Sequence, residues 1–270
     1  VYKRQDYISL LGKLRLVKLP IQLTTHGGFF HTPNQQALKR LWFNTITRFS
    51  LMNVKRVFTI SSNDHNLFEK LTSRCLLVPN GVRLEKFGPK LDYDSTQFDM
   101  VYLGRLSSNK KIDWLIEAYS KLKQPQGDLK IIGNSRTGDA EYIEQCVAKN
   151  NQNQSVQLLF NLSDSEIQKH LSSAKFVVSA SEYEGFGLSV IELMSYGLVP
   201  FLSSRPDSFV DFITEADCGA LFDYNFDVFQ EKYTELTQSW SKEESTKAIL
   251  YSNKFSWAEL SKTITSGYEL

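Results

Sequence analysis

Two carboxylates and two glycines stand close together in the stretch from Ser181 to Pro200. Glu184 and Glu192 are separated by seven residues, and the turn between them contains Gly185, Phe186 and Gly187. Glycine lets a backbone approach its ligand closely, and the N–H groups at the start of a helix attract anions. Carboxylates accept hydrogen bonds from sugar hydroxyls. The stretch therefore predicts a site for a ligand that carries both phosphate and hydroxyl groups.

A strand, a turn and a helix must position these groups. Residues 175–179 form an apolar run typical of a buried strand, and apolar side chains then recur at helical spacing from Leu188 until Gly197. This arrangement would place the amides of residues 185–188 at the N-terminus of the helix. The alternative is an ordinary strand, turn and helix with glutamates on the surface.

Two cations follow another predicted strand, at residues 99–103. Gly104 and Arg105 end this strand, and Lys110 precedes a helix predicted over residues 113–122. Arg can bind a diphosphate with a planar fork and Lys with a point charge, so the pair could replace a metal ion at a leaving diphosphate. We accordingly expect no metal site. Gly133 ends the next predicted strand, and surface charge on a loop is the alternative interpretation.

A third candidate loop follows the short strand predicted over residues 21–25. His26 stands at its end, and Gly27, Gly28 and His31 come next. In open α/β sheets, ligands bind outside the carboxyl ends of the strands. His26 could donate to a sugar hydroxyl or a phosphate. A histidine that caps the loop through backbone hydrogen bonds is an equal alternative from these residues alone.

Strands and helices alternate through the chain, which predicts an α/β fold with doubly wound parallel sheets. Residues 1–91 hold 15 Lys and Arg against 4 Asp and Glu, a net charge of +11, whereas residues 92–270 carry −10. The opposite signs indicate two domains with different partners. A basic half could meet an anionic membrane, a lipid diphosphate or nucleic acid. Since no nucleic-acid-binding motif is present, we expect no nucleic acid partner. A merely solvated basic surface is the other alternative.

One predicted helix, over residues 34–52, combines basic residues with Trp42 and four other large apolar side chains. A basic amphipathic helix with Trp can lie on a membrane surface, although such a stripe more often packs into a core. The apolar positions are Leu38, Leu41, Trp42, Phe49 and Met52.

The remaining composition points to the reducing interior of a cell. The chain has 270 residues and three widely spaced cysteines, with no disulfide framework and no metal-ligand spacing. No run of eighteen apolar residues is present. The first residues lack a Met and any signal-peptide pattern, so we expect native sequence to be missing upstream.

Four motifs occur in the order HGGFFHT, VPNGVRLEKF, GR-x4-K and E-x7-E with GFG inside it. Together they resemble the retaining glycosyltransferases of family 4, which have the GT-B fold. The resemblance extends from about His26 to Trp257 and is strongest to the α-mannosyltransferases that build xanthan- and acetan-type exopolysaccharides on a polyprenyl diphosphate. This sequence departs from the family pattern at Arg83, where Asp is common, and at Lys111, where Gly often stands.

The resemblance implies two Rossmann-like domains facing a cleft. It implies an incomplete N-terminal domain in residues 1–91, a nucleotide-sugar-binding domain in 92–252, and a C-terminal helix in 253–270 that crosses back to the first domain. The family's first glycine-rich loop, which faces the donor phosphates, has no counterpart in this sequence.

The resemblance also implies a role for each candidate residue. Glu184 would orient the hydroxyls of the donor sugar and Glu192 the ribose, while Arg105 and Lys110 would stabilise the diphosphate. The residues expected to bind the donor are Gly104, Arg105, Lys110, Gly133, Glu184, Gly185, Phe186, Gly187, Leu188 and Glu192. His26 would contact the donor sugar, and Gly27, Gly28 and His31 would lie on the acceptor side. The loop 161–164 would lie beside the nucleobase.

The implied activity is transfer of a hexose, with retention, from a nucleotide sugar to a lipid-linked or polysaccharide acceptor. We expect mannose from GDP-mannose, no cofactor, and a cytoplasmic protein at the inner face of the membrane. Two alternatives stay open. One is another nucleotide-sugar enzyme, such as a glucosyltransferase, an N-acetylglucosaminyltransferase or a GT-B epimerase. The other is a fragment that binds a sugar nucleotide without catalysis.

Overall fold

The structure is a computed structural model, which describes residues 21–25, 36–88, 97–135, 139–150 and 155–269. The predicted site residues His26, Gly27, Gly28 and His31 lie outside these ranges. By its contacts the chain divides into two compact units. Unit 1 comprises residues 1–81, 184–186 and 258–270, and unit 2 comprises residues 82–183 and 187–257. The sequence-based boundary lies ten residues later, between residues 91 and 92.

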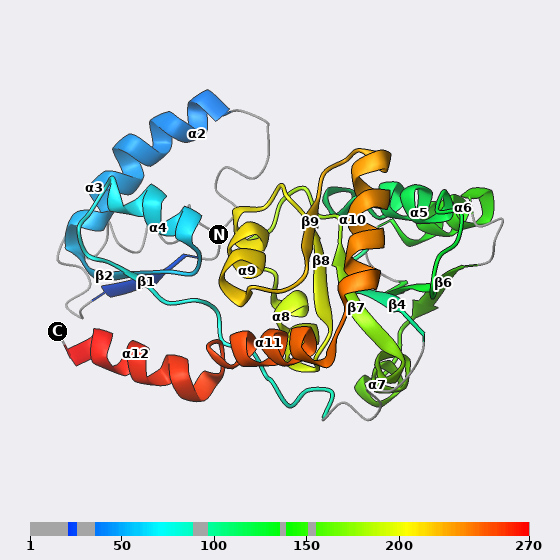
Figure 1. The fold of residues 1–270 in the computed structure, drawn as a ribbon. Helices are drawn as coiled ribbons and strands as arrows, with labels where there is room; N and C mark the ends of the chain where they lie inside the picture. The colour runs from blue at the N-terminus through cyan, green and yellow to red at the C-terminus, as the bar shows by residue number, and fades with distance from the viewer. Residues whose placement is uncertain (1–20, 26–35, 89–96, 136–138, 151–154, 270) are drawn as a thin grey trace. The chain divides into compact units, whose positions relative to one another are not determined.

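Unit 1 contains a parallel sheet with the strand order β1-β2-β3 (Figure 1). Its strands are β1 (Ile21–Thr24), β2 (Val54–Thr59) and β3 (Cys75–Leu77). Its helical segments are α2 (Gln36–Trp42), the π-helix η1 (Phe43–Thr47), α3 (Arg48–Ser50), the 3-10 helix η2 (Leu51–Asn53), α4 (Ser62–Glu69) and α12 (Trp257–Glu269). β-branched and aromatic residues in β2, such as Val57 and Phe58, favour the strand conformation.

The long helix predicted over residues 34–52 is divided into α2, η1, α3 and η2, and its apolar stripe is not core. Leu38, Leu41, Phe49 and Met52 are 58%, 61%, 48% and 57% exposed. The buried members of this segment are instead Phe43 and Leu51, with Thr47 and Ser50. These buried positions also recur at helical spacing, so they share another face of the segment, and Phe43 and Leu51 pack with Leu23, Val54 and Val57 of the sheet.

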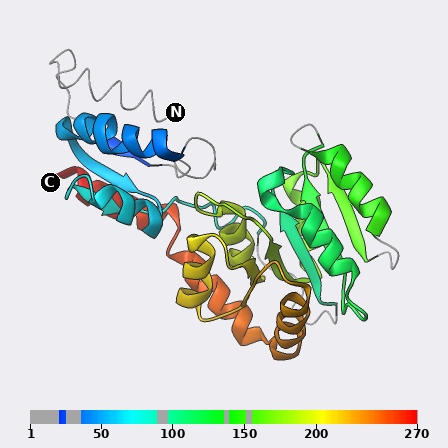
Figure 2. The same cartoon turned by 90° about the horizontal axis from the view of Figure 1, so that it is seen from above.

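Helix α12, near the end of the sequence, completes unit 1. Leu260 packs in one buried cluster with Phe58 and Val78, and Leu76 and Ile264 pack against it. Figures 1 and 2 draw α12, in red, beside the blue and cyan elements of this unit. The hydrophobic surface of the small sheet is thus covered by residues distant in sequence.

Unit 2 is built on a six-stranded parallel sheet with the order β6-β5-β4-β7-β8-β9. The chain first moves from β4 outward to β6 and then returns to the other side of β4 with β7. Such a reversal creates a topological switch point, where open α/β sheets bind their ligands. The strands are β4 (Asp99–Leu103), β5 (Leu129–Gly133), β6 (Val156–Phe160), β7 (Ala174–Ser179), β8 (Val199–Ser203) and β9 (Ala220–Phe222).

Helices connect these strands, as right-handed parallel crossovers require. The connecting segments are the 3-10 turn η3 (Ser108–Lys110), α5 (Ile112–Ser120), α6 (Ala140–Asn150), α7 (Asp164–Ser172), α8 (Leu188–Ser195) and α9 (Asp207–Ala216). Two more helices, α10 (Phe226–Ser239) and α11 (Lys242–Asn253), follow the last strand, β9. The α/β fold class predicted from the alternation of elements is confirmed by this architecture.

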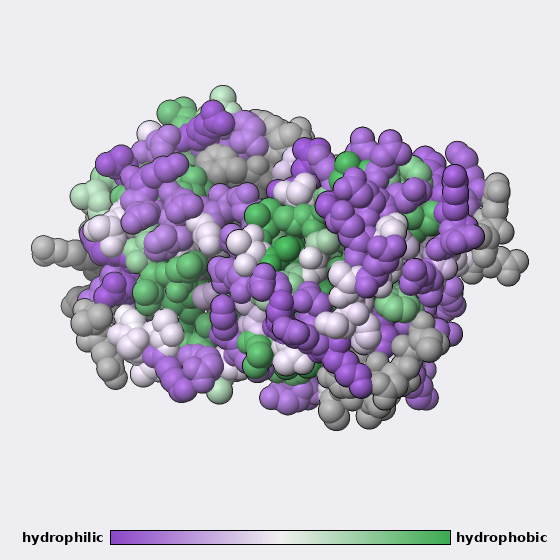
Figure 3. All heavy atoms as spheres, in the orientation of Figure 1, coloured by the Kyte–Doolittle hydropathy of each residue, from purple (hydrophilic) through white to green (hydrophobic). Residues whose placement is uncertain are grey.

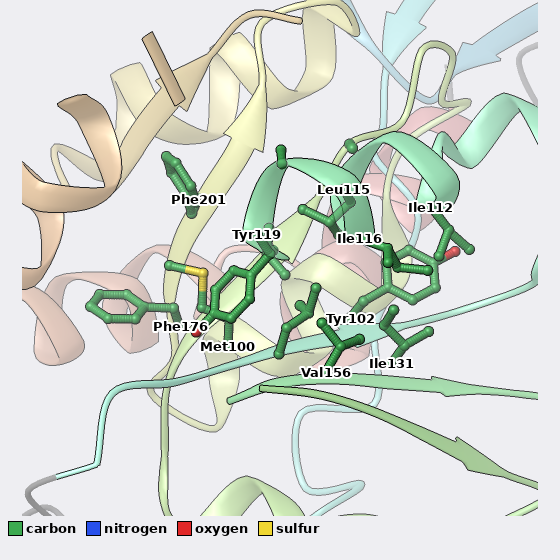
Figure 4. Close-up of a cluster of buried hydrophobic side chains, with 14 of the residues drawn as sticks. Met100, Tyr102, Ile112, Leu115, Ile116, Tyr119, Ile131, Val156, Phe176 and Phe201 are labelled. Atoms are coloured by element: carbon green, nitrogen blue, oxygen red, sulfur yellow. The ribbon is translucent and has the colours of Figure 1, made fainter. Parts of the chain in front are cut away.

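The core of unit 2 lies between the sheet and the helices α5, α6 and α10. Alternate residues of β4, Met100 and Tyr102, project from the sheet toward Leu115, Ile116 and their neighbours on α5 (Figure 4). Because successive strand residues point to opposite faces, the same strand buries Val101 on its other side.

At the opposite end of the strands from the site, a buried ion pair joins β4 to β5. The Lys130 ammonium lies 2.5 Å from the Asp99 carboxylate, which also accepts hydrogen bonds from Ser173 and from the backbone of Asp128. Removing one member of a buried pair leaves the other charge without compensation, which costs about 3 kcal/mol or more. We therefore expect Asp99→Asn to lower the free energy of unfolding by about 3 kcal/mol.

Urea denaturation followed by circular dichroism measures this loss. The double variant Asp99→Asn/Lys130→Met should recover most of it, since no buried charge then remains. The control is Lys121→Met, which breaks an exposed pair with Glu117 of 2.6 Å and should cost less than about 1 kcal/mol. Equal losses for Asp99→Asn and the control would contradict the assignment.

Candidate functional site

A cavity of about 350 Å³ opens in unit 2 at the carboxyl ends of β4, β5 and β6. It lies at the ends of the strands on the β4 side of the switch point, and helix α8 contributes one wall. The lining residues are Lys86, Leu103, Gly104, Arg105, Ile132, Gly133, Asn134, Asn161, Leu162, Ile167, Ser189 and Glu192.

The floor of the cavity needs a glycine at the end of β5. A Cβ atom placed on Gly133 would lie 2.8 Å from Cγ of Leu106, which is fully buried. Any side chain there would force the loop after β4 to move, and that loop carries Arg105. The Arg105 side chain is exposed, but its backbone is fixed: the Tyr102 hydroxyl donates a 2.7 Å hydrogen bond to the Arg105 carbonyl oxygen.

The loop after β6 forms another side of the cavity. Asn161 has a left-handed backbone (φ 57°), and its amide donates a 2.7 Å hydrogen bond to Oγ of Ser135. Helix α7 then begins with a capping box, in which Glu166 accepts a 2.8 Å hydrogen bond from the Ser163 N–H. This bond, with one from the Ser163 hydroxyl, lowers the pKa of the Glu166 carboxyl. The wall that holds Asn161 and Leu162 is thus fixed at both ends.

The turn before α8 depends on Gly187. Its φ of 101° lies in the region that favours glycine, and an added Cβ would stand 3.0 Å from Phe209 and 3.2 Å from Phe212. The first N–H groups of a helix have no acceptor within it. Gly187 therefore brings the amides of Leu188 and Ser189 to the helix start, and Ser189 lines the cavity.

One face of α8 continues this wall. Ser189 and Glu192 are three residues apart, so they lie on the same side of the helix, and both line the cavity. The Glu192 carboxylate accepts a 2.8 Å hydrogen bond from the Lys86 ammonium. The polar side of the cavity consequently carries a negative group beside two cations, Lys86 and Arg105.

Lys110 is not among the residues that line the cavity and stands at the end of η3. The next residue, Lys111, has a left-handed backbone (φ 51°, ψ 39°). This conformation explains the glycine common at that position in the family pattern, because glycine adopts it without steric cost. Lys111 also lies 3.5 Å from the Glu182 carboxylate.

Hydrogen bonds join the loop after β4 to the loop after β7. The N–H of Glu182 donates to the Asn109 carbonyl at 2.8 Å, and the Asn109 side chain donates to the Tyr183 carbonyl at 3.3 Å. Lys110 directly follows Asn109 in the chain, and Glu184 directly follows Tyr183. The backbones that carry the predicted cation and the predicted acid are therefore held together.

The predicted donor residues divide into two groups. Four of them, Gly104, Arg105, Gly133 and Glu192, line the cavity together. The others do not line it and belong to the loops after β4 and β7 or to the start of α8: Lys110, Glu184, Gly185, Phe186, Gly187 and Leu188. The contribution of His26 stays a prediction, since this residue lies outside the described ranges.

Sequence reasoning missed Lys86 as a site residue. It was seen only as part of the VPNGVRLEKF motif, and nothing in its spacing points to Glu192, which is 106 positions away. Two other lining residues were also missed: Asn134, which directly follows Gly133, and Ser189, which stands two residues after Gly187. Across the described ranges, no group of three or more His, Cys, Asp or Glu residues could hold a metal ion.

Comparison with known proteins identifies the family. Residues 85–255 match the family described as Glycosyl transferases group 1. The chain is 34% identical over 220 residues to the GDP-mannose:cellobiosyl-diphosphopolyprenol alpha-mannosyltransferase of Xanthomonas oryzae pv. oryzae. That alignment covers 80% of this chain and 57% of the relative, so the chain spans little more than half of that protein's length.

Solved structures show the fold. The sucrose-phosphate synthase of Thermosynechococcus elongatus superposes with a TM-score of 0.78 at 20% identity, covering 97% of this chain and 70% of that one. HepE of Anabaena, in complex with UDP, gives a TM-score of 0.79 at 14% identity and covers 100% and 77% of the two chains. The fold is the GT-B fold of glycosyltransferases, as the sequence predicted. From the matched family and the Xanthomonas relative together, we conclude that this chain belongs to the group 1 glycosyltransferases.

Proposed function

We propose that the protein transfers mannose from GDP-mannose, with retention, to an oligosaccharide linked to a polyprenyl diphosphate. The observation that carries this proposal is the cavity at the switch point, where Arg105, Ser189 and Glu192 combine a cation, a helix start and a carboxylate. These groups suit the diphosphate and the ribose of a nucleotide. The name of the Xanthomonas relative specifies the donor and the class of acceptor.

Each predicted residue then has a chemical role. Arg105 and Lys110 would balance the charge that develops on the leaving diphosphate, with help from the amides at the start of α8. Glu184 would accept hydrogen bonds from the donor sugar, and Glu192 from the ribose. His26 would reach the sugar from the other domain across the predicted cleft.

We further propose that no metal ion or other cofactor takes part. Arg and Lys supply the positive charge that a divalent cation would otherwise provide. Transfer should therefore proceed at the same rate in EDTA. Loss of activity in EDTA that returns with Mg²⁺ or Mn²⁺ would contradict this part of the proposal.

The test is a donor screen with the purified protein. GDP-mannose, UDP-glucose and UDP-N-acetylglucosamine are each incubated with polyprenyl-diphosphate-linked cellobiose, and products are separated by chromatography and mass spectrometry. We expect a new trisaccharide with GDP-mannose only, and an α-linkage by NMR. A product with only a UDP-sugar would replace the proposed donor.

The same screen distinguishes the alternatives. A GT-B epimerase converts its nucleotide sugar without an acceptor, so each donor is also incubated alone. A binding fragment would retain nucleotide affinity without forming product.

The proposed acceptor carries a lipid, and unit 1 has a surface suited to a membrane. The exposed Leu38, Leu41, Phe49 and Met52 share their helical segment with Lys39, Arg40 and Arg48. A hollow of about 330 Å³ lies beside Phe49 and Met52, between Arg48 and Arg74. Figure 3 shows hydrophobic and hydrophilic side chains interspersed where α2 lies. Such a surface suits contact with anionic lipids, at the inner face of the cytoplasmic membrane.

No described helix is both long and apolar enough to cross a bilayer. We propose peripheral contact, and we expect the protein to sediment with vesicles that contain phosphatidylglycerol in low salt and to be released by high salt. Salt weakens this binding because it screens the attraction between the basic residues and the lipids. Cosedimentation measures the bound fraction.

A paired substitution locates the membrane contact. Leu41→Glu/Phe49→Glu should abolish cosedimentation, because it places carboxylates in the proposed interface. Leu250→Glu is the matched control, since Leu250 is 62% exposed but lies in unit 2. If both variants bind as the wild type does, the basic half is only a solvated surface.

A further inference from the structure

Lys86 lines the cavity, and none of the roles proposed above uses its positive charge. It lies near the start of unit 2, and its ammonium is 2.8 Å from Oε2 of Glu192. The two side chains are only 26% and 18% exposed. The aromatic ring of Phe87 adds a second contact, with its centroid 5.0 Å from the Lys86 nitrogen. The pair is consequently better shielded from water than an ordinary surface ion pair.

The backbone around Lys86 is fixed to unit 2 at several points. The Ser195 hydroxyl, one turn beyond Glu192 on α8, donates a 3.1 Å hydrogen bond to the Leu84 carbonyl. The Val82 N–H donates a 2.8 Å hydrogen bond to the Phe255 carbonyl, and Phe87 is buried. The Lys86 ammonium is thus presented to Glu192 from an anchored segment.

This pairing leaves one oxygen of the carboxylate for a ligand. Among the described residues, the hydrogen bond recorded for the Glu192 side chain is that from Lys86 to Oε2. A carboxylate has about four lone-pair sites on its two oxygens, so Oε1 can accept from a hydroxyl. Both Lys86 and Glu192 line the cavity, together with Ser189.

We propose that Lys86 is a positioning residue for the ribose of the bound nucleotide. It holds Glu192 in the orientation in which the carboxylate accepts from the 2′- and 3′-hydroxyls. This inference rests on the proposed function, because it assumes a nucleoside diphosphate in the cavity.

The experiment compares GDP with 2′,3′-dideoxy-GDP, which has the same base and diphosphate but no ribose hydroxyls. Calorimetry gives the dissociation constant of each for the wild type and for Lys86→Met. We expect Lys86→Met to raise the dissociation constant for GDP about tenfold, the scale of one charge-assisted hydrogen bond. The affinity for the dideoxy nucleotide should change less than about twofold, because it lacks the groups that Glu192 would bind.

Further variants separate positioning from a structural role. Lys86→Arg keeps the charge and should bind GDP within about threefold of the wild type. Glu192→Gln should likewise weaken the binding of GDP more than that of the dideoxy nucleotide. The double variant with Lys86→Met should bind GDP no more weakly than the worse single variant, since both substitutions act on one interaction. Lys232→Met is the matched control, because it breaks an exposed ion pair on α10, in which Lys232 lies 2.7 Å from Glu235.

The outcomes are distinct. Equal weakening of both nucleotides by Lys86→Met would show that Lys86 acts on the diphosphate, and an unchanged affinity for GDP would show that it has no role; either overturns the inference and leaves the proposed function standing. A wild type that binds no nucleoside diphosphate, with UDP tested in parallel, would overturn both.

Discussion

Lys110→Ala is expected to lower kcat/KM for mannosyl transfer by roughly 10²- to 10³-fold, the usual cost of losing one group that stabilises developing charge. The leaving diphosphate gains negative charge as the glycosidic bond breaks. Lys110 stands at the end of η3, next in the chain to Asn109, whose side chain donates a hydrogen bond to the Tyr183 carbonyl. The loss should fall mainly on kcat, because the charge is greatest in the transition state.

Steady-state kinetics with GDP-mannose measure this effect. Lys123→Ala is the control: Lys123 is an exposed lysine just after α5 in the same unit, and its loss should leave kcat/KM within about twofold, as surface substitutions usually do. Lys110→Arg should restore part of the activity. Wild-type turnover in Lys110→Ala, with an unchanged melting temperature, would remove Lys110 from the site.

Glu184→Ala is expected to reduce kcat/KM by about 10²-fold or more, the scale of a lost orienting contact at the reacting sugar. Glu184 follows Tyr183, whose carbonyl accepts a hydrogen bond from Asn109, and precedes the turn at Gly187. Its role is directed at the sugar, so the affinity for GDP, which has no sugar beyond the ribose, should stay within about twofold of the wild type.

Two measurements on the same variant therefore test Glu184. Kinetics report the loss with GDP-mannose, and calorimetry reports the preserved affinity for GDP. Glu144→Ala, on the exposed side of α6, is the control that should change neither. If Glu184→Ala lowers the affinity for GDP by the same factor as it lowers kcat/KM, the carboxylate acts on the nucleotide and not on the sugar.

Most of the sheet in unit 2 could be predicted from the sequence. The apolar runs at residues 99–103, 129–132, 156–160 and 175–179 correspond closely to strands β4 to β7. Strands buried on both faces consist almost entirely of apolar residues, so they stand out against their polar loops. Helix α9 was missed, although Phe209, Phe212 and Ala216 follow helical spacing and are buried.

Side-chain exposure in the helix at residues 36–52 could not be predicted. The sequence offered one apolar stripe through Leu41 and Phe49, and the structure buries Phe43 and Leu51 instead. Both sets of positions recur at helical spacing, so the period does not show which face packs on the sheet. The sequence of this segment alone therefore cannot predict which of its two apolar faces is buried.

Site residues were predictable where they belong to one local motif. Arg105 and Glu192 stood out because each follows or flanks a strand and a glycine turn. Lys86 could not be found this way, because its partnership with Glu192 depends on how a distant segment runs along α8. Local spacing carries no information on such long-range pairs.

The cover that α12 provides for the small sheet has a consequence for synthesis on the ribosome. Phe58 and Val78 are translated long before Leu260, which completes their cluster. At 5–20 residues per second, that interval is on the order of ten seconds or more. Through that interval the sheet of unit 1 still exposes apolar surface. The nascent chain is thus a natural client for a chaperone that shields this sheet until the last helix emerges.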